Sequence, residues 1–307
     1  MRRLAYLLVC IMGLLSCKKD GNDCTPLDTS QNLNYSFDKD FVYKICLNPS
    51  NDNELFLVMQ KNAEGPHQLY KLDLTNSAYT LIYQDNIWNG FDVSPDGEWI
   101  LLTLGDAKIW KIKTNGDSLQ KIVDMELSVY PTFNTNHTFS FLNNNVNKHF
   151  LADLDGNILD TLDNHPAMSN FVDYINDSIA VAKNYTADKC FLSTYNVKSH
   201  VINNIKEVDP GSVVSPIFIG QNTMLWANKE GVYTTSILSG NTTKIRSSCS
   251  SIRYLTPTVN SSKSQVIWVK YIYNQDKDNL SQVYLDTKLI LSDSGFGFEQ
   301  TLTKPSL

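Results

Sequence analysis

Residues 91–103 read FDVSPDGEWILLT, in which a Ser-Pro-Asp-Gly turn separates two apolar runs. Proline presets its own φ, and glycine adopts positive φ at little steric cost, so these four residues specify a tight turn. Another apolar strand follows in the sequence KIWKIKT, with Trp110 at its centre. The stretch therefore predicts a unit of antiparallel strands in which Gly97 has positive φ.

The central aromatic residue of that following strand recurs about every 40 residues. The series consists of Tyr70, Trp110, Phe150, Phe191, Tyr233 and Tyr284. In each repeat, a turn rich in Asn, Gly, Asp or Ser comes before an apolar strand, as a tight hairpin requires. Helical repeats of this length would instead show a period of about 3.6 residues, so the pattern is typical of propeller blades.

These repeats predict an all-β fold, a six-bladed β-propeller with four antiparallel strands per blade over residues 41–293. Pro131, Pro216 and Pro257 fall at one phase of the first strand of their repeats. We expect both terminal blades to contain four strands of their own, with the tail 294–307 covering the seam between them.

The SPDG turn and the stretch IWKIKTNGDSLQKI after it resemble the repeat of TolB-like propellers and of the related propellers of prolyl-oligopeptidase-type enzymes. The resemblance extends over residues 41–292, and the second unit matches the pattern best. It implies a propeller that binds other molecules. The sequence has no Gly-x-Ser-x-Gly elbow and no added α/β segment long enough for a hydrolase, so peptidase activity is not expected.

The N-terminus begins MRRLAYLLVCIMGLLSC, two arginines followed by an apolar run that ends at Ser16-Cys17. A bilayer-spanning helix needs about 20 apolar residues, so this shorter run is typical of a signal peptide. Leu14 to Cys17 resembles a bacterial lipobox, and the KKD that follows weakly resembles the export tethers of Bacteroidota lipoproteins. We expect a signal peptide over 1–16, lipidation of Cys17 and a tether over 17–40. An ordinary secretory signal is the alternative, and a transmembrane anchor is the third reading.

The expected location is therefore the outer membrane, lipid-anchored and either periplasmic or surface-exposed. The chain is acidic, with a formal net charge of −6, and its lysines are scattered rather than gathered in a basic stripe, so nucleic acid is not expected as a partner. We expect the membrane and an envelope protein or glycan as partners. Cleavage and lipidation would leave four cysteines, and either a Cys24–Cys46 disulfide or free buried thiols fit them.

No metal site or cofactor is expected. The sequence DLDGNILD (153–160) places glycine fourth rather than sixth, so we interpret it as a turn and not as a calcium loop. Metal-ligand spacing is absent from the five histidines, which are His67, His137, His149, His165 and His200.

The first functional hypothesis is a non-catalytic binding or scaffold module for a protein or glycan. A propeller enzyme such as a polysaccharide lyase, with its site at the channel mouth, is the second, and a structural subunit of an envelope complex is the third. A lyase would need a cluster of His, Arg or Lys to neutralise a uronate and abstract its proton. The inner strands offer Lys44, Asp92, Thr132 and Thr258, which is a poor set, so no catalytic residue is predicted.

Loops between blades share a face with the loops between second and third strands, and aromatic side chains with an arginine favour interfaces. We expect a partner to dock on this predicted binding face; packing between the loops is the alternative reading. Its residues are Trp88, Tyr130, His165, Arg253, Tyr254, His67, Tyr185 and Tyr273. The opposite face has tight turns such as SPDG, which we expect to be too short to build a pocket.

Overall fold

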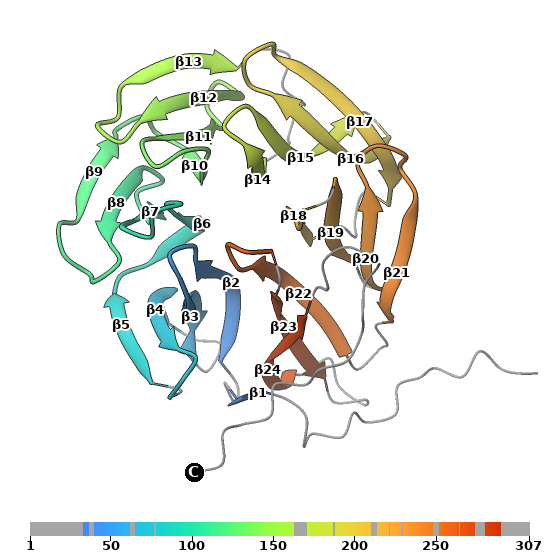
Figure 1. Cartoon of the computed structure of the whole chain (residues 1–307). Coiled ribbons are helices and arrows are strands. Elements are labelled where there is room, and N and C mark those ends of the chain that lie inside the picture. Colours follow the sequence, from blue (N-terminus) through green and yellow to red (C-terminus); the bar gives the residue numbers. More distant parts are fainter. Residues whose placement is uncertain are drawn as a thin grey trace, which may run out of the picture.

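Short apolar strands alternate with polar turns along the chain, and they fold into four-stranded antiparallel sheets arranged in a ring (Figure 1). The computed structural model describes residues 33–36, 40–61, 65–76, 78–162, 171–186, 188–209, 214–220, 222–228, 230–247, 252–263, 265–273 and 280–289. Within these ranges, no helix has the length and apolar character needed to cross a membrane. The predicted all-β propeller with four antiparallel strands per blade is confirmed.

Five blades are each built from four consecutive strands. Within a blade, the strand nearest the channel is called the first strand and the outermost the fourth. The first contains β2 (Phe41–Asn48), β3 (Asn51–Gln60), β4 (Gln68–Asp73) and β5 (Tyr79–Tyr83). The second contains β6 (Ile87–Val93), β7 (Trp99–Leu104), β8 (Ile109–Lys113) and β9 (Gln120–Val123). The third contains β10 (Ser128–Phe133), β11 (Thr138–Asn143), β12 (Lys148–Asp153) and β13 (Ile158–Leu162).

The remaining two continuous blades follow the same order. The fourth contains β14 (Phe171–Asn176), β15 (Ile179–Thr186), β16 (Lys189–Asn196) and β17 (Val201–Val208). The fifth contains β18 (Val214–Phe218), β19 (Thr223–Asn228), β20 (Gly231–Ser236) and β21 (Thr242–Ser247).

A further four-stranded sheet joins the two ends of the chain. It contains β22 (Ile252–Val259), β23 (Gln265–Tyr273) and β24 (Leu280–Leu289), and its outermost strand is β1 (Leu33–Ser36). β1 pairs with β24 antiparallel, with Leu33 opposite Leu285. This sheet corrects two expectations: the last blade does not supply all four of its strands, and part of the predicted tether 17–40 belongs to the propeller. Residues 1–32, with the predicted signal peptide and Cys17, and the tail 294–307 lie outside the described residues.

The innermost strands share an irregularity that accounts for their prolines. The pairing register shifts between Val129 and Thr132 in β10, and comparable shifts occur in β18 and β22. Pro131, Pro216 and Pro257 lie inside these shifts. Proline has no N–H to donate to a ladder, so it is tolerated where pairing is interrupted.

The SPDG segment forms the predicted turn between β6 and β7. Gly97 has φ of 72°, as expected, and its N–H donates to the Ser94 carbonyl at 2.8 Å. The Ser94 hydroxyl donates to Asp96 Oδ1 at 2.6 Å and accepts from the Trp99 N–H at 2.9 Å. These contacts explain why each residue of the turn is specified.

The recurring aromatic residues all lie on the third strands of their sheets, which confirms the register of the repeat. They are Tyr70 on β4, Trp110 on β8, Phe150 on β12, Phe191 on β16, Tyr233 on β20 and Tyr284 on β24. Tyr70 and Tyr233 are buried, and Trp110, Phe150 and Phe191 are half-buried.

The turns between third and fourth strands lie against the outer strand of the preceding blade. A Cβ added to Gly116 would lie 3.4 Å from the Ile82 carbonyl oxygen, and one added to Gly240 would lie 2.9 Å from the Ile205 carbonyl oxygen. At Gly156 it would overlap the Ile122 carbonyl oxygen. These close approaches explain why glycine recurs in this turn.

The DLDGN segment is also a turn, as interpreted from the sequence. Asp153 Oδ1 accepts hydrogen bonds from the N–H groups of Asp155 and Asn157, at 3.0 and 2.9 Å. The carboxylate that a calcium loop would need is thus occupied by backbone donors.

Apolar side chains fill each junction between neighbouring sheets. One cluster joins β3 to β23 through Leu57 and Val269, and another joins β19 to β23 through Leu225 and Trp268. The other clusters join the continuous blades in sequence order. Hydrophobic burial therefore holds the ring together all the way round.

Candidate functional site

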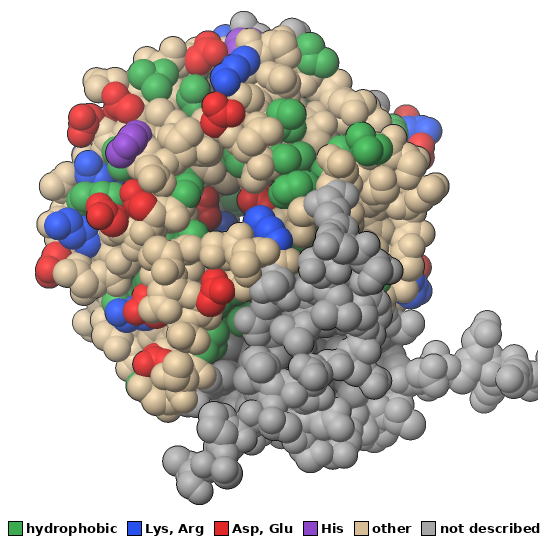
Figure 2. Space-filling model, in the orientation of Figure 1, with side chains coloured by type: hydrophobic (Ala, Val, Ile, Leu, Met, Phe, Trp, Pro, Cys, Tyr) green, Lys and Arg blue, Asp and Glu red, His purple; other side chains and the backbone are tan. Residues whose placement is uncertain are grey.

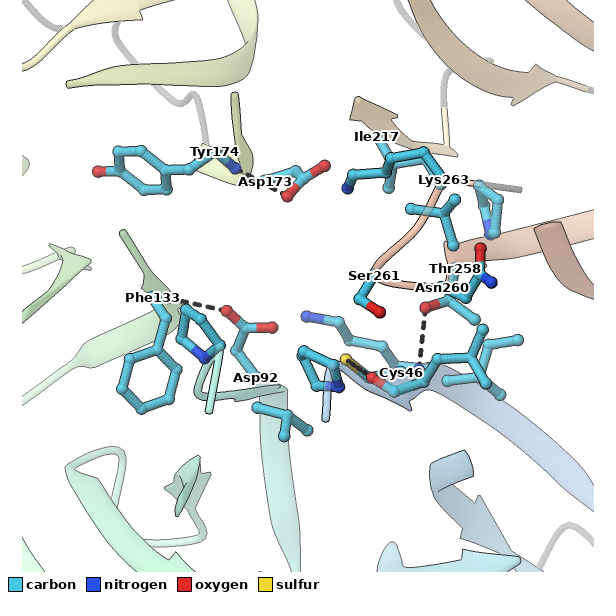
Figure 3. A pocket seen from close by; sticks show the side chains of 18 of the residues that line it. Cys46, Asp92, Phe133, Asp173, Tyr174, Ile217, Thr258, Asn260, Ser261 and Lys263 are labelled. Carbon is cyan, nitrogen blue, oxygen red and sulfur yellow. Dashed lines mark hydrogen bonds between the residues drawn. The ribbon is translucent and has the colours of Figure 1, made fainter. Parts of the chain in front are cut away.

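The centre of the ring contains a cavity of about 250 Å³ (Figure 3). It is lined by the ends of the innermost strands β2, β6, β10, β14, β18 and β22 and by the turns that follow several of them. Among these turn residues are Pro49, Pro95, Asn134 and Asn260, and Asn176 ends β14 beside them. Short turns from different blades thus build the cavity together, and the expectation that the turn face is too short to form a pocket is wrong.

Four charged side chains converge on the cavity from four different sheets. Lys44 comes from β2, Asp92 from β6 and Asp173 from β14, and Lys263 comes from the turn between β22 and β23. Acidic and basic side chains surround the central opening in the space-filling view (Figure 2). In the closer view, the Asp92 and Asp173 carboxylates point inward (Figure 3).

The two aspartates link neighbouring blades through backbone N–H groups. Asp92 Oδ2 accepts from the Phe133 N–H of β10 at 2.8 Å. Asp173 Oδ2 accepts from the Phe218 N–H of β18 at 2.7 Å, and its Oδ1 accepts from the Tyr174 N–H at 2.8 Å. Buried backbone donors need such partners, so these carboxylates stabilise the ring as well as line the cavity.

Thr258 makes the corresponding link across the closing sheet. Its Oγ1 accepts from the Leu47 N–H of β2 at 3.0 Å. Thr258, Asp92 and Asp173 occupy corresponding positions in their innermost strands, and each accepts from the N–H of a residue on the innermost strand of the next sheet. The same hydrogen bond from one blade to the next therefore recurs around the channel.

Burial dominates the electrostatics of the two aspartates. It raises the pKa of Asp92 to about 6, while the nearby positive charge of Lys44 and the Phe133 N–H act in the opposite direction. Burial also raises the pKa of Asp173, opposed first by the positive charge of Lys263. Removing a carboxylate from water disfavours its charged form, and the cavity compensates only part of that cost.

The two lysines do not form contact ion pairs with these aspartates. The Lys44 ammonium donates to the Phe91 carbonyl and lies 5.5 Å from the centroid of its ring. Lys263 Nζ lies 5.9 Å from the Phe218 ring centroid. None of the ion pairs within 4.0 Å in the described part of the chain joins any of the four cavity charges.

Cys46 also lines the cavity and has a free thiol. Burial raises the pKa of this thiol to about 12, and the Asp92 charge adds to the effect. The thiol is therefore protonated and unreactive at neutral pH. Cys190 is likewise a free, buried thiol, whereas Cys24 lies outside the described residues.

None of the described residues of the predicted binding face lines the cavity. Trp88 and Tyr130 lie half-buried near the starts of β6 and β10, whereas the cavity is built from the ends of those strands. The His67 ring lies 3.9 Å from that of Tyr43, and its Nδ1 is 3.1 Å from the Ile87 carbonyl. Tyr185 is half-buried on β15.

Four members of that face fall, by side chain or entirely, outside the described part of the chain. Arg253 and Tyr254 fall on β22 and Tyr273 falls on β23, but their side chains lie outside the described part of the structure. His165 lies outside the described residues altogether. Docking of a partner on this face therefore stays a prediction.

Sequence reasoning named Lys44, Asp92, Thr132 and Thr258 but missed Asp173 and Lys263. A signal for Asp173 was present, because Asp173-Tyr174 stands at the same point of its repeat as Asp92-Val93. Lys263 had no such signal, since it follows the innermost strand by several residues and reaches the cavity only through the course of its turn.

No protein-family model matches the sequence, and no curated protein matches it in sequence. Solved structures do share the fold. TolB from Acinetobacter baumannii superposes with a TM-score of 0.57 at 13% identity over 68% of this chain. The chain spans 56% of that TolB chain, so it covers a little over half of its length.

Two further solved structures are similar to this chain in fold. An oligogalacturonate lyase from Vibrio parahaemolyticus has a TM-score of 0.55 at 13% identity, with 81% of this chain and 78% of the other covered. A structure described as a nidogen/laminin complex has a TM-score of 0.54 at 9% identity, covering 74% of this chain and 96% of the other. At these identities the likeness extends to the fold alone, and the chain has the fold of a TolB-like β-propeller.

Proposed function

We propose that the protein is a lipid-anchored, six-bladed envelope propeller that binds a protein or a glycan without catalysing a reaction. Its location would be the outer membrane, on the periplasmic or the surface side. The observation that supports a binding role is the charged central cavity, which opens among the turns of several blades. A ring of this kind presents a rigid surface around a recess, which suits recognition of a partner.

The bonding of the cavity residues supports a non-catalytic role. Asp92 and Asp173 accept backbone hydrogen bonds from neighbouring blades, and Lys44 donates to the Phe91 carbonyl. A general base must instead be able to reach the proton that it removes. Both aspartates therefore spend part of their hydrogen-bonding capacity on holding the ring, which favours recognition over proton transfer.

Capture of a partner from the native membrane tests this proposal. The tagged, full-length protein should retain a specific partner, identified by mass spectrometry. If the partner docks at the cavity, Lys263→Ala should weaken capture at least about tenfold. If it docks on the predicted binding face, Trp88→Ala with Arg253→Ala should do so.

Asn115→Ala is the control for both faces, because Asn115 lies at an exposed outer turn. Equal capture by all the variants, or loss in the control alone, would argue against both docking sites. A preparation that retains no partner from any envelope fraction would argue against the binding module itself.

Membrane attachment through Cys17 has its own test. The lipobox resemblance predicts that Cys17→Ala blocks acylation and processing, because the thiol is the acceptor of the lipid. The mature form should then disappear from the washed outer-membrane fraction, as followed by immunoblotting and metabolic lipid labelling. Unchanged processing and membrane retention of the variant would contradict the anchor.

A lyase is the second candidate, favoured by the likeness to the oligogalacturonate lyase fold and by the chemistry of two cavity residues. An aspartate with a pKa of about 6 suits proton abstraction near neutral pH, and Lys263 would face a uronate carboxylate. Lyases leave an unsaturated product that absorbs ultraviolet light. Turnover of oligogalacturonate that Asp92→Asn abolishes would favour this candidate over the first.

A further inference from the structure

The charges of the cavity are divided between two sides of the ring. Asp92 and Asp173 belong to the second and fourth blades, and the third blade, which lies between them, contributes Phe133 and Asn134. Lys44 and Lys263 belong to the first blade and the closing sheet, which are neighbours. The recess therefore has an acidic side, formed by the second and fourth blades, and a basic side, formed by the first blade and the closing sheet.

These charges are not neutralised at contact distance. Among the described residues, no ion pair within 4.0 Å joins a lysine to Asp92 or Asp173. Lys44 and Lys263 nevertheless lie near enough for their positive charges to lower the pKa values of the two aspartates. Charges that are removed from water without a close partner are costly, and their interactions with an incoming charge are strong because water screens them poorly.

The carboxylates also retain capacity for further hydrogen bonds. Each carboxylate oxygen has two lone pairs, and the N–H groups of Tyr174 and Phe218 use one on each oxygen of Asp173. On Asp92, Oδ2 accepts the Phe133 N–H in the same way. An ammonium group has three donors and would satisfy acceptors on the acidic side.

The size of the recess limits what enters. A cavity of about 250 Å³ is smaller than the roughly 300–1,000 Å³ that is typical of sites for drug-sized ligands. A macromolecule would insert at most one side chain, whereas an amino acid would fit as a whole.

We propose that this cavity binds a small zwitterion, a molecule of amino-acid size whose ammonium group lies against Asp92 and Asp173 and whose carboxylate lies against Lys263 and Lys44. The proposal deepens the proposed function, since it rests on the ring being a binding module. It names a ligand that the cavity takes independently of any macromolecule that docks around it.

Isothermal titration calorimetry on the full-length mature protein tests the proposal with glycine, β-alanine and γ-aminobutyrate. These probes differ in the distance between ammonium and carboxylate, so one of them should match the spacing across the cavity. N-acetylglycine and glycinamide each keep one charge, and both should bind at least tenfold more weakly than the best zwitterion. Binding should also weaken with added salt.

Two substitutions locate the binding. Asp92→Asn keeps an oxygen acceptor for the Phe133 N–H but removes the charge, and Lys263→Gln removes the opposite charge from the turn. Each should weaken zwitterion binding at least tenfold while the thermal unfolding curve stays cooperative. The control is Lys189→Gln, a half-exposed lysine paired with Glu207 at the edge of the fourth blade, which should leave binding unchanged.

Equal binding of singly charged and zwitterionic probes, no binding of any probe, or binding that survives both cavity substitutions would overturn the proposal. Preference for N-acetylglycine that depends on Lys263 alone would identify an anion site instead. Retention of a macromolecular partner from membranes together with failure of every zwitterion would reject this ligand and keep the proposed function.

Discussion

Replacing Gly156 with alanine should destabilise the protein strongly, by roughly 3 kcal/mol or more. Gly156 has φ of 87°, where an L-residue is strained, and an added Cβ would overlap the Ile122 carbonyl oxygen of the preceding blade. A backbone oxygen cannot rotate away as a side chain does, so the two blades would have to separate. Chemical denaturation followed by circular dichroism measures the change in the free energy of unfolding.

Two other glycines separate the effect of the contact from the effect of the backbone angle. Gly65 has φ of 81° with nothing within 4 Å of an added Cβ, so Gly65→Ala should cost only about 1 kcal/mol. Gly116, whose Cβ would lie 3.4 Å from the Ile82 carbonyl, should fall between them. Equal losses at all three positions would show that backbone strain alone matters and that the blades do not meet at Gly156.

Replacing Asp92 with alanine should leave the protein less stable than replacing it with asparagine, by about 2 kcal/mol. Alanine leaves the buried Phe133 N–H without its acceptor, whereas the asparagine carbonyl oxygen retains one. The comparison isolates the hydrogen bond, because both substitutions remove the buried charge. Equal stability of the two variants at neutral pH would mean that water replaces the carboxylate in this role.

The same residue links stability to pH. The carboxyl of Asp92 has an ordinary pKa of 3.8 when unfolded and about 6 when folded, so between these values the folded state binds a proton that the unfolded state lacks. The contribution of Asp92 to the free energy of unfolding is therefore fully present below about pH 4 and is lost as pH rises through about 6. Between about pH 4 and pH 6, the free energy of unfolding of Asp92→Asn should therefore rise by roughly 2 kcal/mol relative to that of the parent, as measured by denaturation at each pH.

Much of the fold was predictable because its determinants are local. Gly97 and the third-strand aromatics Trp110 and Tyr233 could be placed from turn chemistry and a period of about 40 residues. The closing strand could not, because β1 is four residues long and its partner lies near the other end of the chain. A short strand of that kind has no repeating pattern to distinguish it from a tether.

The site was predictable only in part, for a different physical reason. Asp92 could be assigned to the channel from its place in an innermost strand, but its pKa depends on burial by other blades and on Lys44. The expectation that short turns build no pocket treated each loop alone. A ring brings the turns of several blades to one opening, so the depth of the recess comes from convergence rather than from loop length.

Because β1 pairs with β24, the ring can close only after nearly the whole chain has been synthesised. The first strand of the propeller to leave the ribosome is among the last to find its partner, because β24 is the final strand of the ring. Until β24 has been synthesised, β1 has no strand to pair with, and unpaired strand edges invite association with other chains. β1 also follows Cys17 after only a short stretch of chain. If the protein is anchored at Cys17, any tension on that stretch would therefore act directly on the strand that closes the ring.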